Sequence, residues 1–281
     1  MASFKKIRER ASLYGIVSFF ALFSVFPFYW MLIAMFKQDH DLFNPAANPF
    51  LFNEPATLTH LRVLLCDTLF LQYLVNTCVV GISVVAITVL ISVPAAYSLA
   101  RLTGRWGENL GIGIFLTYLI PPTLLFIPLS RMIGFFGLHE SLGALILIYP
   151  TFTIPFCTWL LMGFFKSIPK DIEEQAMVDG CSRMGAMVKI IFPLSVSGIL
   201  TVVVFAFTLT MHEFIYALAF ISVSSMKTIS IGVPTELVRG DVFRWGPLMA
   251  GALIPSIPVA VIYTFFLDRF IAGFTMGAIK G

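Results

Sequence analysis

The chain has 281 residues, of which 58% are hydrophobic and 12% are charged, about half the charged share of a typical soluble domain. This composition excludes an ordinary soluble globular domain, because too few polar side chains are present to cover its apolar surface. The formal net charge of +3 at pH 7 is too small to indicate binding to nucleic acid. The composition instead predicts an all-α membrane protein whose residues 1–281 form a single domain.

Six apolar stretches are long enough to cross a bilayer, whose hydrocarbon core of about 30 Å requires about 20 helical residues. They cover residues 11–36, 73–100, 110–133, 142–165, 194–223 and 247–267. The first stretch is too long for a signal peptide and no cleavage site follows it, so we expect an uncleaved first helix. The third contains Pro121, Pro122 and Pro128, which predicts a kinked helix inside the bundle.

Basic residues are distributed unevenly between alternate loops. With the N-terminus placed inside, 12 of the 18 Lys and Arg residues lie on the inner side and the other six on the outer side. Cytoplasmic loops carry the excess of Lys and Arg in membrane proteins. The sequence therefore predicts a multi-pass protein with both termini in the cytoplasm. The loop of residues 166–193 and the tail of residues 268–281 are then cytoplasmic as well.

The loop of residues 166–193 carries signals for two short helices. Ser167 is a candidate N-cap, and Pro169 falls in the first turn, where a missing N–H is tolerated. Gly180 is placed to end the first helix in a left-handed conformation. Ser182 is a candidate N-cap for a second helix that runs to Pro193. The sequence thus predicts a helix–turn–helix outside the membrane.

The first of these helices has the features of a docking element. Asp171, Glu173 and Glu174 place negative charge near its N-terminus, where the helix dipole favours it. Ile172 and Ala176 are four residues apart and are expected on one face, which would fit a groove on another protein. On physical grounds alone, a solvated amphipathic loop remains the alternative.

The spacing of residues in this loop resembles the EAA loop of binding-protein-dependent ABC importer permeases, whose pattern is E-A-A-x3-G-x9-I-x-L-P. The resemblance implies contact with an ATPase for Glu174, Gln175, Ala176, Asp179, Gly180 and Pro193. We call residues 166–193 the coupling loop. Gln175 departs from the usual first alanine, and Phe192 departs from the usual leucine. The residues around the motif, from Pro169 to Gly180, are similar to the carbohydrate branch of these permeases.

Two further segments extend the resemblance. Residues 211–218 are similar to the W-N-E-F-x-x-A-L stretch in the fifth helix of sugar permeases; Glu213 and Phe214 match it, whereas Met211 and His212 depart from it. Residues 272–281 resemble the tail of the smaller, six-helix maltose-permease-type subunit. In that family the tail reaches into the ATPase dimer, which implies ATPase contacts for Thr275, Gly277 and Lys280.

The resemblance implies a type I ABC importer permease-like fold in the bacterial inner membrane and a non-catalytic role in alternating access. Its implied partners are a second, homologous permease chain, a cytoplasmic ATPase dimer, an extracytoplasmic sugar-binding protein and membrane lipid. The chain shows no P-loop or hydrolase motif, so no cofactor is expected on it. ATP and Mg are expected in the ATPase. A di- or oligosaccharide is the implied cargo, with a polyol or glycerol phosphate as an alternative.

Glu213 is the one carboxylate well inside a predicted span, where an acidic residue costs about 2.5–3.5 kcal/mol. Three roles are open: lining the sugar path, contacting another helix or subunit, or coupling to protons. The last would suit a secondary carrier, although the two matching halves typical of such carriers are not visible in the sequence. His212 is about 100° around the helix from Glu213, so the two are not expected to bind one ligand from the same face.

Overall fold

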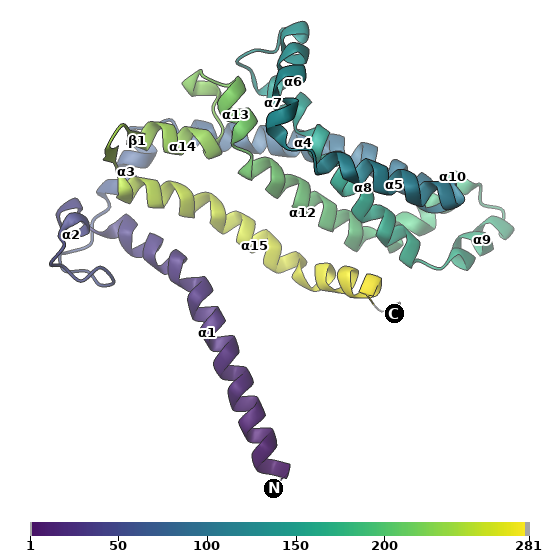
Figure 1. Cartoon of the computed structure of the whole chain (residues 1–281), viewed down its shortest axis with the longest axis horizontal. Coiled ribbons are helices and arrows are strands. Elements are labelled where there is room, and N and C mark those ends of the chain that lie inside the picture. Colours follow the sequence, from purple (N-terminus) through teal and green to yellow (C-terminus); the bar gives the residue numbers. More distant parts are fainter. Residues whose placement is uncertain (1, 279–281) are drawn as a thin grey trace. The chain divides into compact units, whose positions relative to one another are not determined.

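The computed structural model describes residues 2–278. This part of the chain is helical almost throughout (Figure 1), and a short hairpin pairs strands β1 (Val238–Arg239) and β2 (Val242–Phe243). The helices are α1 (Ala2–Phe36), α2 (Asp39–Phe43), α3 (Thr59–Cys66), α4 (Phe70–Arg101), α5 (Gly104–Tyr118), α6 (Pro122–Phe136), α7 (Leu142–Ile148), α8 (Pro150–Ser167), α9 (Lys170–Val178), α10 (Arg183–Ala186), η1 (Met187–Ile191), α11 (Phe192–Leu194), α12 (Val196–His212), α13 (Ile215–Phe220), η2 (Ser224–Met226), α14 (Ile229–Leu237) and α15 (Trp245–Ala278).

Contacts within the chain define two compact units. The first, which we call unit 1, contains the residues up to Phe70 together with Val233–Ile257. The second, unit 2, contains Leu71–Gly232 and the residues from Pro258 onward. The coupling loop and the segment around Glu213 both belong to unit 2.

The predicted spans coincide with helices of the structure. Among the described residues, four helices are long and apolar enough to cross a membrane alone. Each of two bent helix pairs would add one crossing if the pair forms a single span, which gives up to six. The single helices cover Arg10–Phe36, Phe70–Arg101, Leu142–Ser167 and Trp245–Phe265; the bent pairs are Gly104–Tyr118 with Pro122–Phe136 and Arg183–Leu194 with Val196–His212. Each of the six predicted stretches falls on one of these crossings.

The third stretch is broken more sharply than a kink. The axes of α5 and α6 meet at 88°, with the break at Ile120 and Pro121. Pro121 has an extended backbone (φ −56°, ψ 131°), and Pro122 starts α6. Two consecutive prolines explain the break: each lacks an N–H, and Pro122 also disfavours helical geometry at the residue before it.

The fifth stretch was expected as one helix over residues 194–223, and this expectation is wrong. The chain bends by 73° at Ser195, between α11 and α12. It is interrupted again after His212, because Glu213 adopts an extended conformation with ψ 124°. Glu213 therefore lies in a break between α12 and α13 rather than within a helix.

Two clusters of buried side chains form the core of unit 2. The first joins α4, α6, α7, α13 and α14, and includes Val84, Ile133, Leu145, Tyr216 and Ile231. The second joins α4, α8, η1 and α12, and includes Tyr97, Leu161, Phe165, Ile191 and Val202. At Gly198 a Cβ would lie 2.7 Å from the Phe164 ring, so the glycine permits the close approach of α12 to α8.

Unit 1 contains an ordered loop after α1. Lys37 Nζ lies 3.3 Å from Asp41 Oδ1 and donates a 2.8 Å hydrogen bond to the Asn48 carbonyl. Burial raises the pKa of Asp41, but hydrogen bonds from Asn53 and Lys37 outweigh it, so the net pKa lies below the ordinary value. The span of α1 itself is almost entirely exposed, with 6% of its apolar window buried, as expected of a helix that faces lipid or another chain.

The last helix is longer than predicted. The apolar stretch was expected to end at residue 267, but α15 continues as a helix to Ala278. The segment predicted as a cytoplasmic tail is therefore helical over residues 268–278.

Candidate functional site

The first helix of the coupling loop, α9, begins and ends close to the predicted positions. Pro169 occupies the N-cap position, and Ser167 instead donates back to the Phe164 carbonyl at 2.7 Å, so the expected Ser167 cap is wrong. Gly180 has φ +91°, and Cys181 N–H donates to the Ala176 carbonyl at 3.0 Å. The glycine thus closes α9 in the left-handed conformation that the sequence predicted.

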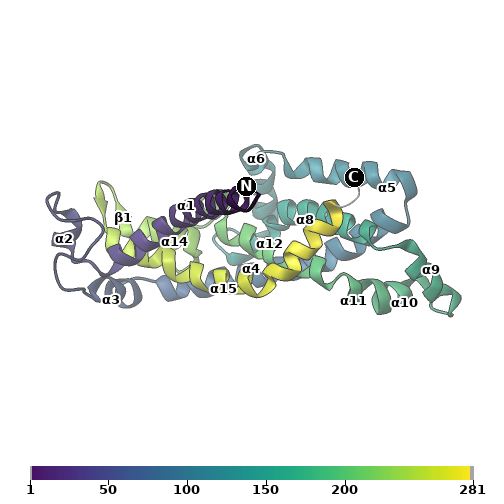
Figure 2. The same cartoon turned by 90° about the horizontal axis from the view of Figure 1, so that it is seen from below.

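The second helix of the coupling loop is also present. The Ser182 hydroxyl accepts a 3.1 Å hydrogen bond from Gly185 N–H and caps α10, as predicted. The helix continues through the π-helical segment η1 into α11, which contains Pro193. Figure 1 and Figure 2 both show α9 and α10 at one extremity of unit 2, next to each other.

The face of α9 that was expected to dock on another protein is not the exposed one. Ala176, expected on that face with Ile172, is instead buried within this chain, whereas Ile172 is exposed. The residue that shares the buried face with Ala176 is Glu173, three positions earlier and 5% exposed. Sequence analysis treated Glu173 only as a charge near the helix N-terminus and missed its inward orientation.

The outward face of α9 carries most of the predicted ATPase-contacting residues. Glu174, Gln175, Asp179 and Gly180 are exposed on it. Val178, which the sequence analysis did not single out, is 87% exposed beside them. This face is thus polar at Glu174 and Gln175 and apolar at Val178.

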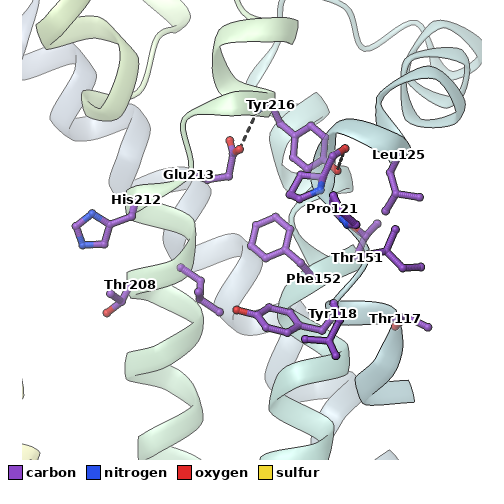
Figure 3. Close-up of a pocket in the computed structure, with 14 residues that line it drawn as sticks. Thr117, Tyr118, Pro121, Leu125, Thr151, Phe152, Thr208, His212, Glu213 and Tyr216 are labelled. Carbon is purple, nitrogen blue, oxygen red and sulfur yellow. Dashed lines mark hydrogen bonds between the residues drawn. The ribbon is translucent and has the colours of Figure 1, made fainter. Parts of the chain in front are cut away.

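A pocket of about 540 Å³ lies beside Glu213 (Figure 3). It is formed where α5 breaks into α6, where α8 begins, and where α12 breaks into α13. Aromatic, aliphatic and threonine side chains all contribute to its lining, which consists of Thr117, Tyr118, Leu119, Ile120, Pro121, Pro122, Leu125, Thr151, Phe152, Thr208, Leu209, His212, Glu213 and Tyr216.

The Glu213 carboxylate is held by three hydrogen bonds. Oε1 accepts from Tyr216 N–H at 2.8 Å, and Oε2 accepts from Ala217 N–H at 3.0 Å and from the Tyr149 hydroxyl at 2.8 Å. The two amides belong to the first turn of α13, so the carboxylate acts as its cap. Tyr149 precedes α8 directly, so Glu213 also joins α13 to α8.

His212 and Glu213 point in different directions. Figure 3 shows the carboxylate directed toward Tyr216 and the imidazole directed away from it. His212 ends α12 and is exposed, and it lines the pocket together with Glu213. The structure thus brings both residues to one pocket with divergent side chains, although the helical geometry from which the sequence analysis argued ends at His212.

The structure describes two of the three tail residues that were expected to contact the ATPase. Thr275 and Gly277 lie in the last turns of α15. Lys280 lies outside the described residues.

The fold of this chain is known from a solved structure. It is shared with a chain from a solved bacterial ABC transporter involved in the import of the acidic polysaccharide alginate, with a TM-score of 0.78 at 18% sequence identity. The match covers 94% of this chain and 97% of that one. The two chains thus have the same fold over almost their whole length.

The chain belongs to the family of binding-protein-dependent transport system inner membrane components, which residues 89–275 match. It is 34% identical to the sulfoquinovosyl glycerol transport system permease protein SmoH of Agrobacterium fabrum, over 92% of this chain and 89% of the relative. It is 30% identical to the trehalose/maltose transport system permease protein MalG of Thermococcus litoralis, over 93% of each. The resemblance to importer permeases inferred from the coupling loop is confirmed.

Proposed function

We propose that this chain is a membrane subunit of an ATP-driven, binding-protein-dependent importer that moves a saccharide into the bacterial cytoplasm by alternating access. Family membership supports the importer class. The names of the two relatives above support a carbohydrate cargo. A second, homologous permease chain completes the path, an extracytoplasmic binding protein delivers the sugar, and lipid covers the outer faces.

The observation that carries the proposal is the arrangement of α9. A nine-residue helix presents Glu174 and Val178 outward, packs Ala176 inward, and ends at a glycine with positive φ. An isolated helix of this length is marginal in water, so contacts with other groups must stabilise it. In this proposal α9 docks on a cytoplasmic ATPase pair, which binds ATP and Mg, while this chain catalyses nothing.

The orientation follows from the same proposal. Docking of α9 on a cytoplasmic ATPase requires the coupling loop to be cytoplasmic, in agreement with the excess of Lys and Arg on that side. Both termini are then cytoplasmic. The end of α15, with Thr275 and Gly277, can then contact the ATPase pair as well.

The pocket beside Glu213 is this chain's contribution to the sugar path. Aromatic rings such as Phe152 and Tyr118 can stack against the apolar faces of a sugar ring, and the Thr151 hydroxyl can hydrogen-bond to one of its hydroxyl groups. None of the described residues that line it is Lys or Arg. A neutral, hydroxyl-rich cargo therefore suits this pocket better than a phosphorylated one.

Glu213 itself serves the structure of the pocket. Its three hydrogen bonds occupy both carboxylate oxygens and fix the break between α12 and α13. This geometry supports a contact between helices and disfavours proton coupling, while Glu213 also lines the pocket proposed as part of the sugar path. A proton-coupled carrier would need a carboxylate that exchanges its partners freely, and Glu213 is tied to two backbone amides.

The substitution Gly180→Val tests the proposal. Nothing lies within 4 Å of a Cβ at this position, so valine adds no clash and its effect is the strain of a positive φ, about 1–3 kcal/mol. This strain is small for the membrane bundle and large for a short helix. We expect normal membrane insertion, loss of ATPase co-purification and loss of uptake, measured with labelled sulfoquinovosyl glycerol, trehalose and maltose. Glu174→Lys should act in the same way by changing the charge of the docking face.

Gly137→Val is the matched control. Gly137 also has a positive φ, +65°, and no atom within 4 Å of a Cβ, but it ends α6, which Figure 1 and Figure 2 show away from α9. This variant should keep the ATPase bound. Full uptake and full ATPase binding by Gly180→Val would mean that α9 does not couple the two proteins, and the proposal would lose its main support.

A further inference from the structure

An acidic side chain of α9 that points inward attaches the coupling loop to the rest of unit 2. Glu173 is buried, whereas Asp171 and Glu174 on the same helix are exposed. Burying a carboxylate is unfavourable unless hydrogen bonds and an opposite charge compensate for the lost water. The orientation of Glu173 therefore depends on specific partners.

The partners of Glu173 come from the last two turns of α4. The Tyr97 hydroxyl donates a hydrogen bond to Glu173 Oε1, and Arg101 Nε lies 3.4 Å from Glu173 Oε2. Arg101 Nη2 also donates at 2.7 Å to the carbonyl of Ile168, which joins α8 to α9. Tyr97 and the Arg101 side chain are buried, so water and salt screen these interactions little.

Apart from Glu173 and the Ile168 carbonyl, which both bind α4, the attachments of α9 described here lie close to it in the sequence. The helix is joined to the chain through Ile168 and Pro169 at one end and the Gly180 turn at the other. It packs against α10 and η1, which follow it in the sequence. The contacts of Glu173 instead reach α4, 76 residues away from it in the chain at Tyr97. They tie the exposed helix to a helix long enough to cross the membrane.

We propose that Tyr97, Arg101 and Glu173 form a strut that transfers a displacement of α9 to α4. The proposal rests on the proposed function, in which the ATPase pair moves α9. An ion pair and a hydrogen bond hold one carboxylate at both oxygens, and a close-packed surrounding leaves the side chains little room to yield. The three are positioning residues: they touch neither cargo nor ATP, and they determine how far α4 follows α9.

Polar contacts continue from α4 to the pocket. Thr88 and Thr153 hydroxyls lie 2.6 Å apart, and the Ser92 hydroxyl donates at 3.3 Å to the Ile154 carbonyl of α8. Thr153 and Ile154 follow the pocket residues Thr151 and Phe152 directly in α8. A displacement of α4 can thus reach the residues that line the pocket through contacts between neighbouring helices.

The test separates ATP hydrolysis from transport. The complex is purified through a tag on this chain and reconstituted in proteoliposomes, and uptake per ATP hydrolysed is measured with whichever of the three labelled saccharides the wild type transports. Glu173→Gln should keep the ATPase bound and hydrolysing, while uptake per ATP falls roughly two- to thirtyfold, the range expected for residues in a coupling network. Asp171→Asn, which changes an exposed carboxylate of the same helix, should keep the wild-type ratio.

Two further variants keep the test decisive. Tyr97→Phe removes one hydrogen bond and keeps the ring, so it should lower the ratio even if Glu173→Gln fails to insert. Glu173→Arg alone should lower the uptake per ATP hydrolysed. The double variant Glu173→Arg with Arg101→Glu, which exchanges the two charges, should recover part of that loss. An unchanged ratio in Tyr97→Phe and Glu173→Gln would overturn the strut, as would loss of ATPase binding in Glu173→Gln. If Gly180→Val also leaves uptake and ATPase binding intact, the proposed function itself fails.

Discussion

Removing the Glu213 side chain should destabilise the break between α12 and α13. In Glu213→Ala the Tyr149 hydroxyl, on a residue with no exposed surface, loses its acceptor. The amides of Tyr216 and Ala217 lose the carboxylate that caps α13. The substitution thus leaves one buried side-chain donor and two backbone donors without the partners described here.

The size of the effect follows from these lost contacts. An unsatisfied buried donor costs about 1–3 kcal/mol, and a lost helix cap costs about 0.5–2 kcal/mol. Glu213→Ala should therefore lower the stability of the assembled protein by about 2–5 kcal/mol. Glu213→Gln keeps one acceptor oxygen, so we expect a smaller loss of about 1–3 kcal/mol.

A second substitution tests the cause of the loss. Tyr149→Phe removes the hydroxyl that Glu213→Ala leaves unpaired, so the double variant should be more stable than Glu213→Ala alone by about 1–3 kcal/mol. Thermal unfolding of the purified complex measures this order, and uptake of labelled saccharide measures function in parallel. No recovery in the double variant would refute the assignment of the destabilisation to the orphaned hydroxyl.

Transport by Glu213→Gln decides between a structural and a proton-coupling role. Glutamine cannot carry the charge, but it can keep one hydrogen bond to α13 or to Tyr149. We therefore expect partial uptake with Glu213→Gln and much less with Glu213→Ala. Loss of all uptake in a Glu213→Gln complex that assembles and unfolds like the wild type would contradict the structural role.

Two other predictions concern topology and a surface contact. In cells with a permeable outer membrane, an impermeant thiol reagent should label the exposed Cys66 and leave Cys181 unmodified; labelling of Cys181 from outside would reverse the proposed orientation. Hydrogen bonds from Val223 and Ser222 N–H hold the pKa of the Glu140 carboxyl below its ordinary value. The stabilisation that these two hydrogen bonds give to the folded protein is therefore fully present above the ordinary pKa of a glutamate. It is lost as the pH falls through the lowered pKa of Glu140. Hydrogen exchange at these two amides should show this loss, whereas Glu140→Gln should have weak protection at all pH values.

The features that the sequence predicted well are those encoded locally. The six apolar stretches fall on the candidate crossings because span length and hydropathy are properties of each segment alone. Gly180 and Ser182 end and begin helices as expected, because capping involves side chains and amides only a few residues apart. The consecutive prolines Pro121 and Pro122 also predicted where the third apolar stretch breaks, although the angle of the bend depends on packing.

The features that the sequence did not predict depend on residues far apart in the chain. Glu173 points inward because Tyr97 and Arg101 are there to bind it, and nothing near Glu173 in the sequence indicates those partners. The interruption at Glu213 lacks a local proline or glycine, and the hydroxyl of Tyr149, 64 residues away, helps to hold it. Pattern reasoning placed Glu213 within a helix because the stretch of residues 194–223 around it is largely apolar.

One helix connects the two carboxylate sites. Tyr149, which binds Glu213, directly precedes α8, and Ile168, whose carbonyl binds Arg101, directly follows it. The 18 residues of α8 form a rod about 27 Å long. A shift of α8 relative to α12 would strain the Glu213 contacts at one end, and a shift relative to α4 would strain the Arg101 contact at the other. The pocket and the coupling loop are thus attached to opposite ends of α8. When one end of this helix is displaced, the contacts at the other end must either resist the displacement or move with it.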